Sequence, residues 1–346
     1  MKSYTVQGQY GRSDIHVGER LGNLQRYLPN DRQVVIVTDD NIKALYGGLF
    51  PDVPVITIGT GEKIKTLATV EKILRELIRL SCDRSCFLVG IGGGIVCDIT
   101  GFAASCFLRG IDFGFVSTSL LSQVDASVGG KNGVNLDAYK NMVGVFNQPE
   151  FVLCDLDMLK TLPKEEISNG LAEIVKHGLI KDDALLAFIE TNKTKALALD
   201  RETLFRLVAD SVEIKSRVVQ ADEKEAGERR KLNFGHTIGH AIEKIEQGGH
   251  GRAVSAGMVA AARFSLKKGY LSESDVERII TLLTDLNLPV ELNQNASEVI
   301  KAAGKDKKKE GTGVYYVFLE KIGRARVDKI PFNEMNDFIR STFPSS

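Results

Sequence analysis

Two histidines spaced by four residues, His236 and His240, are the first feature of this 346-residue chain that indicates chemistry. In a helix that spacing places both side chains on one face, and His250 follows shortly after. Three neutral imidazoles, or two imidazoles and a carboxylate, with one open position make a catalytic zinc site. The spacing matches the zinc-protease motif H-E-x-x-H, but Thr237 stands where that motif needs its glutamate, which disfavours a protease. The cluster predicts a metal site, with purely structural histidines as the alternative.

Two glycine-rich segments could bring bare backbone close to a phosphate. Gly92-Gly93-Gly94 stands between an apolar run and a helical pattern, which places N–H groups at a helix N-terminus. It is not the dinucleotide fingerprint because Ile95 takes the place of the third glycine, and a tight turn without a ligand is the alternative. The segment 129–133 adds Lys131, and Lys140 follows. Ammonium groups beside backbone donors suit a phosphate monoester, although a solvated turn with surface lysines has the same pattern.

Glu173 and Lys176 are three residues apart in a helical pattern, so they share a face. A surface ion pair is the simplest interpretation. Against it, Glu173 has apolar neighbours, and a carboxylate facing a core needs a cation or a metal. The charged run at 305–309 is typical of a solvated loop.

The elements that must position these residues divide the chain into two halves. Short β-branched or apolar runs at 34–37, 53–58, 86–91, 113–116 and 151–153 predict strands, and residues 66–80 predict an amphipathic helix. From about residue 162 the pattern is helical, interrupted by an expected small hairpin at 314–319 and 326–330. We expect a Rossmann-like parallel-sheet α/β domain over residues 1–160, followed by a mostly α-helical domain over residues 161–346.

Composition narrows the class of function. Forty-five Lys and Arg balance 45 Asp and Glu, which argues against a general nucleic-acid binder or a binder of anionic membranes. No apolar run approaches the ~18–20 residues of a membrane span, and the first residues show no secretory signal. Five cysteines, three of them in apolar stretches, indicate buried free thiols. We expect a cytoplasmic enzyme with a small anionic ligand.

Several longer stretches occur together, in order, between Val37 and Lys308: GGGIVCDITGF, LRGIDF, TSLLSQVDASVGGKNGVN, KNMVGVFNQP, NGLAEIVKHGLI, ADEKE, NFGHTIGHAIE and HGRAVSAGM. With these stretches the chain resembles the 3-dehydroquinate synthases of the sugar-phosphate cyclase superfamily. The resemblance implies cyclisation of 3-deoxy-arabino-heptulosonate 7-phosphate to 3-dehydroquinate. In that reaction NAD transiently oxidises a ring hydroxyl, phosphate is eliminated, the hydride returns, and an intramolecular aldol step closes the carbocycle.

The resemblance also implies the site residues. The metal ligands, for zinc or possibly cobalt, are Glu173, His236 and His250. The catalytic set is Asp125, Lys131, Lys176, Arg229, Asn233 and His240. Further substrate contacts are Arg109, Lys140, Asn141, Lys215, Glu225 and Lys308, and Arg109 is expected to reach the neighbouring subunit of a homodimer. The NAD contacts are Asp39, Asn41, Glu62, Lys65, Gly93, Gly94, Asp98, Thr118, Ser119 and Thr161.

The chain departs from the family pattern at a few positions. Arg252 stands where glutamate is usual and reverses a charge two residues from a predicted ligand, which could retune the metal surroundings or alter substrate choice. The other departures are Cys97 for glycine, Ser117 for proline, Asn132 for threonine, Tyr139 for glycine and His177 for tyrosine.

Three alternatives remain at the level of sequence. A sister cyclase would act on another sugar phosphate, but a substrate without a carboxylate has no use for Lys215, Arg229 and Lys308 together; an aminated analogue stays open. A metal-dependent polyol dehydrogenase would make net NADH and needs no phosphate-binding lysines. The third alternative is an inactive NAD-binding regulator, against which the intact ligand set argues.

Overall fold

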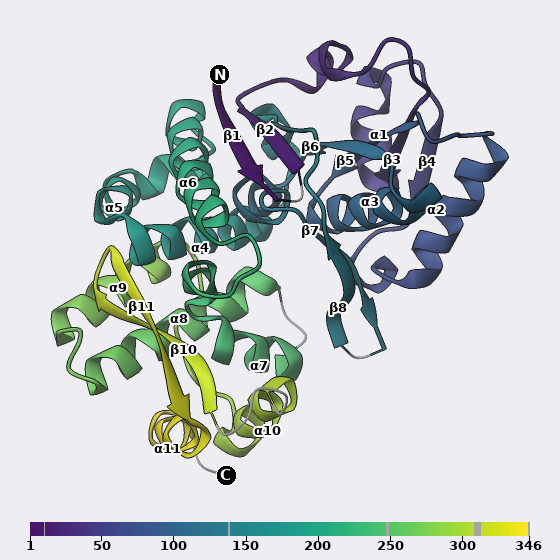
Figure 1. The fold of residues 1–346 in the computed structure, drawn as a ribbon. Helices are drawn as coiled ribbons and strands as arrows, with labels where there is room; N and C mark the ends of the chain where they lie inside the picture. The colour runs from purple at the N-terminus through teal and green to yellow at the C-terminus, as the bar shows by residue number, and fades with distance from the viewer. Residues whose placement is uncertain (10, 138, 247–248, 308–312, 345–346) are drawn as a thin grey trace. The chain divides into compact units, whose positions relative to one another are not determined.

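The computed structural model describes residues 1–9, 11–137, 139–246, 249–307 and 313–344 (Figure 1). The chain divides into two compact units. The first comprises Met1–Pro163 and Leu204–Glu223, and the second comprises Lys164–Thr203 and Lys224–Ser346. The segment 204–223, most of helix α6 (Arg201–Ala221), therefore belongs with the first unit although the chain on both sides of it belongs to the second.

A seven-stranded sheet organises the first unit. Its order is β1 (Lys2–Gly8), β2 (Gly11–Val17), β9 (Phe151–Cys154), β6 (Asp112–Ser117), β5 (Phe87–Gly92), β3 (Val34–Asp39) and β4 (Val55–Ile58). All neighbours pair in parallel except β1 and β2. Strands β3, β5 and β9 are almost wholly buried, as the continuous apolar runs predict for a parallel sheet covered on both faces. The α/β fold predicted for the first half is confirmed; the antiparallel β1–β2 hairpin was not predicted.

The helices of this unit follow their strands. Helix α1 (Asp40–Tyr46) follows β3, α2 (Leu67–Arg79) follows β4, and α3 (Gly94–Cys106) follows β5. Helix α2 buries Val70, Ile73 and Leu77, as its periodicity predicts, while Leu67 at its first turn is exposed.

The second glycine-rich segment leads into a strand, because Gly129 and Gly130 have positive φ and β7 begins at Lys131. Strand β7 (Lys131–Leu136) pairs antiparallel with β8 (Tyr139–Phe146), and Gly133 lies opposite Gly144. A Cβ at Gly133 would lie 2.6 Å from the Val143 carbonyl oxygen, so the glycines permit the close pairing. The alternative of a solvated turn does not hold for residues 131–136, and the strand was not predicted because Gly133 and Gly144 lower the strand signal that Val134, Val143 and Val145 provide.

The second unit is mostly helical. Its helices are α4 (Lys164–Lys181), α5 (Asp183–Leu197), α7 (His236–Glu246), α8 (His250–Lys267), α9 (Glu273–Asp285), α10 (Ala296–Lys307) and α11 (Phe332–Thr342). The predicted hairpin is present as β10 (Gly313–Lys321) and β11 (Arg324–Pro331). Helices α7 and α8 approach closely, since a Cβ at Gly257 would lie 2.7 Å from the Gly239 backbone nitrogen.

Two further predictions concern thiols and membranes. Cys86, Cys97 and Cys154 are buried and free, whereas Cys106 is exposed and Cys82 is half-buried, so the expectation of burial was wrong for Cys106. Within the described ranges, no helix combines the length and the apolar character needed to cross a bilayer.

Candidate active site

One buried carboxylate organises the predicted metal cluster. Glu173 lies in α4 with its side chain fully inaccessible, and the Lys176 ammonium forms an ion pair with one of its oxygens. The Nε2 atoms of His236 and His250 lie 3.6 and 3.5 Å from Glu173 Oε1. Ligand atoms of the three residues all lie within 4.8 Å of one another. A buried carboxylate that faces two imidazole nitrogens is a donor set suited to zinc or cobalt.

The protonation of this cluster agrees with such a role. Burial, together with the Lys176 ammonium, lowers the pKa of His236 well below its usual range, so this imidazole is neutral. Burial opposes the charged form of His250, but Glu173 and Glu243 outweigh it and raise its pKa to about 9. A metal ion would displace that proton. Although burial opposes ionisation, Lys176 holds the pKa of Glu173 well below its usual range.

Oxygen atoms beside the Nδ1 atoms of His236 and His250 orient both rings. His236 Nδ1 lies 3.2 Å from the Phe234 carbonyl oxygen, which fixes Nδ1 as the donor and leaves the Nε2 lone pair for a metal. His250 Nδ1 lies 3.7 Å from Glu243 Oε1. The helix spacing could have revealed Glu243, because it lies three residues after His240 and seven after His236 on the same face; the sequence analysis missed it.

Lys176 and His240 complete the polar surroundings of the cluster. Lys176 is buried and forms an ion pair with Glu173, which rules out the alternative of a surface ion pair. The ring centroids of His240 and His236 are 5.2 Å apart, in an edge-to-face arrangement.

The short helix η7 (Glu228–Asn233) leads into α7 and holds two predicted substrate contacts. Arg229 is 2% exposed. The amide of Asn233 donates to the Glu225 carboxylate, and Glu225 has a positive φ of 61°. Two predicted substrate residues, Asn233 and Glu225, are therefore in direct contact.

In the first unit, Lys215 of α6 meets a π-helical turn, η5 (Ser122–Ala126). The Lys215 ammonium is 2.6 Å from the Asp125 carbonyl oxygen and also forms an ion pair with the Asp125 carboxylate. Single π-helical turns occur often at functional sites. Two residues predicted to bind substrate, far apart in sequence, are thus in direct contact.

A hydrogen-bond network links residues predicted for NAD with one predicted for substrate. Lys65 Nζ lies 2.5 Å from Asp98 Oδ2 and 2.6 Å from Asn141 Oδ1. Asn135 continues the network, since its amide donates to Glu62 at 2.8 Å and its oxygen accepts from the Asn141 backbone N–H at 2.8 Å. The sequence analysis missed Asn135, and an asparagine in a glycine-rich strand carries no signal that would have singled it out.

The first glycine turn has the form expected of a phosphate cradle. Strand β5 ends at Gly92, Gly93 precedes the first turn of α3, and no side chain caps that turn. Its N–H groups are therefore suited to an anion. A Cβ at Gly94 would lie 2.7 Å from Ala126 Cβ, so a larger residue would displace η5.

The remaining predicted NAD contacts flank this turn or α1. Asp39 accepts the Ile42 N–H and caps α1, on which Asn41 lies; Thr161 Oγ1 is 2.7 Å from the hydroxyl of Tyr46 in α1. The Thr118 N–H donates to the Gly92 carbonyl, and the Ser119 side chain bonds Ser122 at 3.0 Å.

Family models for the two parts of 3-dehydroquinate synthase match residues 55–169 (N-terminal) and 170–309 (C-terminal). The chain belongs to the 3-dehydroquinate synthase family. A 3-dehydroquinate synthase of Coxiella burnetii (strain CbuG_Q212) is 42% identical, with 94% of this chain and 95% of the relative covered. One of Geobacter metallireducens is 41% identical, with coverages of 93% and 91%.

A sister cyclase shares the fold. A crystal structure of 2-deoxy-scyllo-inosose synthase, complexed with carbaglucose-6-phosphate, NAD⁺ and Co²⁺, matches with a TM-score of 0.87 and 26% identity. The match covers 99% of this chain and 100% of that chain. This likeness confirms the predicted architecture for a member of the 3-dehydroquinate synthase family.

Four other residues predicted from the family resemblance lie on the β7–β8 hairpin, on η4 or outside the described residues. Lys131 and Lys140 lie on the β7–β8 hairpin with exposed side chains. Arg109 ends η4 (Phe107–Arg109) with a positive φ of 75°. Lys308 lies outside the described residues. Arg252, the charge reversal relative to the family, is exposed on α8, so its guanidinium faces solvent.

Proposed function

We propose that this chain is a 3-dehydroquinate synthase, which converts 3-deoxy-arabino-heptulosonate 7-phosphate to 3-dehydroquinate and phosphate in aromatic amino acid biosynthesis. The observation that carries the proposal is the convergence of two imidazoles on the buried carboxylate of Glu173, in a chain of this family. When bound, a zinc or cobalt ion would polarise a substrate hydroxyl and NAD would accept and return a hydride.

The chain's own residues would bind and orient the substrate. Glu173, His236 and His250 would hold the metal. Lys215 and the buried Arg229 offer fixed positive charge to a carboxylate and a phosphate, because Asp125 holds Lys215 in place and burial restricts Arg229. Lys131, Lys140, Asn141, Lys308 and Arg109 would supply further anion contacts. His240, beside the predicted ligands, would transfer a proton, with Lys176, Asn233 and Glu225 completing the set.

The NAD contacts form a second proposed group. The glycine turn would receive the pyrophosphate at the start of α3, and Asp39 would bind the adenosine ribose. The Lys65 network joins Asp98 and Glu62 to Asn141, so cofactor and substrate residues of the first unit would be ordered together. Asn41, Thr118, Ser119 and Thr161 would contribute the remaining contacts.

A homodimer in the cytoplasm also belongs to this proposal. The β7–β8 hairpin exposes apolar side chains, with Tyr139 50% and Met142 49% accessible, and Leu136 and Val145 also exposed. Such a two-stranded hairpin is a candidate contact for a second copy, and it is the same hairpin that carries Lys131 and Lys140. The free thiols support a reducing, intracellular setting.

The decisive experiment supplies 3-deoxy-arabino-heptulosonate 7-phosphate, zinc and substoichiometric NAD, and measures phosphate and the carbocycle formed. We expect phosphate and 3-dehydroquinate in equal amounts, far exceeding the NAD. Stoichiometric NADH would instead indicate a polyol dehydrogenase. No phosphate from folded, metal-loaded protein would point to a sister cyclase with another sugar phosphate.

A further inference from the structure

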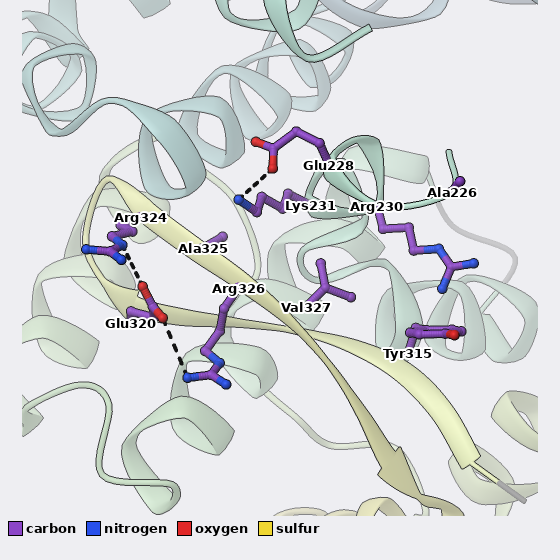
Figure 2. Close-up of a pocket in the computed structure, with 11 residues that line it drawn as sticks. Ala226, Glu228, Arg230, Lys231, Tyr315, Glu320, Arg324, Ala325, Arg326 and Val327 are labelled. Atoms are coloured by element: carbon purple, nitrogen blue, oxygen red, sulfur yellow. Dashed lines mark ion pairs between the residues drawn. The ribbon is translucent and has the colours of Figure 1, made fainter. Parts of the chain in front are cut away.

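Polar groups outside the proposed metal, substrate and NAD sets differ in how firmly they can hold their neighbours. A pocket of about 440 Å³ in the second unit, beside η7 and the β10–β11 hairpin, is lined by ion pairs (Figure 2). There Glu320 pairs with Arg324 and Arg326, and Glu228 pairs with Lys231. These side chains are between 23% and 66% exposed, and ion pairs in contact with water contribute little to order.

A cluster of polar side chains around the π-helical turn η5, in the first unit, is buried instead. Its members, Ser117, Ser122, Gln123 and Ser127, are at most 2% exposed. The Gln123 side-chain amide donates to the Ser117 and Asp155 carbonyl oxygens, both at 3.0 Å, which ties the turn to the ends of β6 and β9. Because a buried polar group is costly unless it is hydrogen-bonded, these bonds fix the path of the backbone.

Ser122 is the centre of this cluster. Its hydroxyl donates to the Ser119 carbonyl oxygen at 2.9 Å and accepts from the Ser117 hydroxyl at 2.7 Å. The Ser122 backbone N–H donates to the Ser119 hydroxyl at 3.3 Å, and the two hydroxyl oxygens lie 3.0 Å apart. The Ser127 hydroxyl donates to the Ser122 carbonyl oxygen at 2.6 Å. One serine therefore joins the end of β6, the segment at Ser119 and both ends of η5.

The two segments that Ser122 joins both pack against the glycine turn that begins α3. A Cβ at Gly93 would lie 3.4 Å from Ser119 Oγ, so the Ser119 hydroxyl lies beside the turn. A Cβ at Gly94 would lie 2.7 Å from Ala126 Cβ, so the last residue of η5 contacts the same turn. A shift of either segment would change the surroundings of the N–H groups that are proposed to receive the pyrophosphate.

Burial separates the roles of these residues. Ser119 and Asp125 are half-buried and can meet a ligand, whereas Ser122 is inaccessible and can act only through them. We propose that Ser122 is a positioning residue for NAD and substrate. Its hydroxyl holds Ser119, a proposed NAD contact, beside the glycine turn, and it anchors η5, whose Asp125 holds Lys215. The inference rests on the proposed function, which assigns Ser119 and Asp125 to these ligands.

Calorimetric titration with NAD tests this role without turnover. Ser122→Ala should raise the NAD dissociation constant about fivefold to tenfold, the change expected when a hydrogen bond no longer orders a contact residue. Ser265→Ala is the matched control, because Ser265 is also fully buried, donates to the Ala261 carbonyl oxygen and accepts the Leu319 N–H in the second unit. It should lose comparable stability in urea unfolding and bind NAD as the wild type does.

A double-mutant cycle tests whether Ser122 acts through Ser119. The combined loss of NAD affinity in Ser119→Ala with Ser122→Ala should be smaller than the product of the two single factors, because both changes disturb one contact. Ser122→Cys keeps the shape of the side chain and a weak donor. It should lie between wild type and Ser122→Ala, and it decides the test if Ser122→Ala does not fold.

Steady-state kinetics separate positioning from a general loss of structure. Partial unfolding lowers kcat at unchanged KM, whereas loosened contacts raise the KM for NAD and for the sugar phosphate. We expect a higher KM for both ligands in Ser122→Ala and an unchanged KM in Ser265→Ala.

Equal NAD dissociation constants in Ser122→Ala and Ser265→Ala, independent losses in the cycle, or a lower kcat at unchanged KM would each overturn the inference. A wild-type chain that binds NAD without synthase turnover would count against the proposed function alone, because the NAD titrations still decide the role of Ser122. A wild-type chain that binds no NAD would overturn both.

Discussion

His250 Nδ1 lies 3.7 Å from a carboxylate oxygen of Glu243, while the Nε2 atom of the same ring lies 3.5 Å from Glu173. One imidazole therefore connects a predicted metal ligand with a second buried carboxylate. A carboxylate behind a metal-binding histidine fixes the ring and raises its basicity.

Glu243→Gln should weaken zinc binding about 10- to 100-fold. A neutral amide orients the His250 ring less firmly than a carboxylate does, and it does not raise the basicity of that ring. Competition with a chromophoric chelator measures the affinity. Glu246→Gln, an exposed carboxylate on the same helix that pairs with Gln294, is the matched control. Equal affinities in the two variants would remove Glu243 from the support of the site.

His236→Ala should abolish stoichiometric zinc binding, since the remaining two ligands leave a low-affinity site. Metal content after dialysis, measured by atomic absorption, provides the test. His16→Ala removes a half-buried histidine of the first unit that bonds Ser3, and should retain a full equivalent. A full zinc equivalent in His236→Ala would refute its assignment as a ligand.

Asn135→Ala should weaken NAD binding several-fold, because it removes the bonds that hold Glu62 and the Asn141 backbone, each worth about 1 kcal/mol. Calorimetric titration with NAD gives the dissociation constant. Asn23→Ala breaks a bond to Glu19 elsewhere in the first unit and should bind NAD normally. Unchanged affinity in Asn135→Ala would show that the network does not order the cofactor residues.

Tyr139→Glu with Met142→Glu should convert the proposed dimer to monomers, because charges on the exposed hairpin oppose an apolar contact. Sedimentation velocity reports the mass. Leu49→Glu places a charge at another exposed leucine and should leave the dimer intact. A wild-type monomer, or a dimer that survives the double substitution, would exclude the hairpin as the contact.

Glu19 should make the stability of the protein dependent on acidic pH. Burial opposes its ionisation, but donors from Asn23, Tyr27 and the Arg20 backbone outweigh burial and lower its pKa. Its contribution is therefore complete above the unfolded value of about 4.3 and is lost as pH falls through the lower folded value. In urea unfolding, Glu19→Gln should cost about 1 kcal/mol at pH 7 and reduce the loss on acidification. Glu71→Gln, in an exposed helical pair, should do neither; equal acid sensitivity in wild type and Glu19→Gln would contradict the assignment.

The sequence predicted those elements whose signal is local. The buried strands β3, β5 and β9 are continuous apolar runs, and α2 follows its 3.6-residue period. The β1–β2 and β7–β8 hairpins escaped prediction because glycines and polar residues interrupt their alternation. The direct contact of Lys215 with Asp125 could not be predicted from spacing, since it depends on where α6 packs. Glu243 was within reach of helical periodicity, whereas Asn135 was not.

The membership of residues 204–223 in the first unit has a consequence for synthesis on the ribosome. Strand β1 contacts α6 through an ion pair between Lys2 and Glu213, and the Gln220 side-chain amide donates a hydrogen bond to the Thr5 carbonyl oxygen. The amino-terminal strand must therefore wait until more than half of the chain has emerged before these contacts can form. A fragment that ends at Pro163 would lack them, so the first unit cannot be obtained intact by a single cut of the gene.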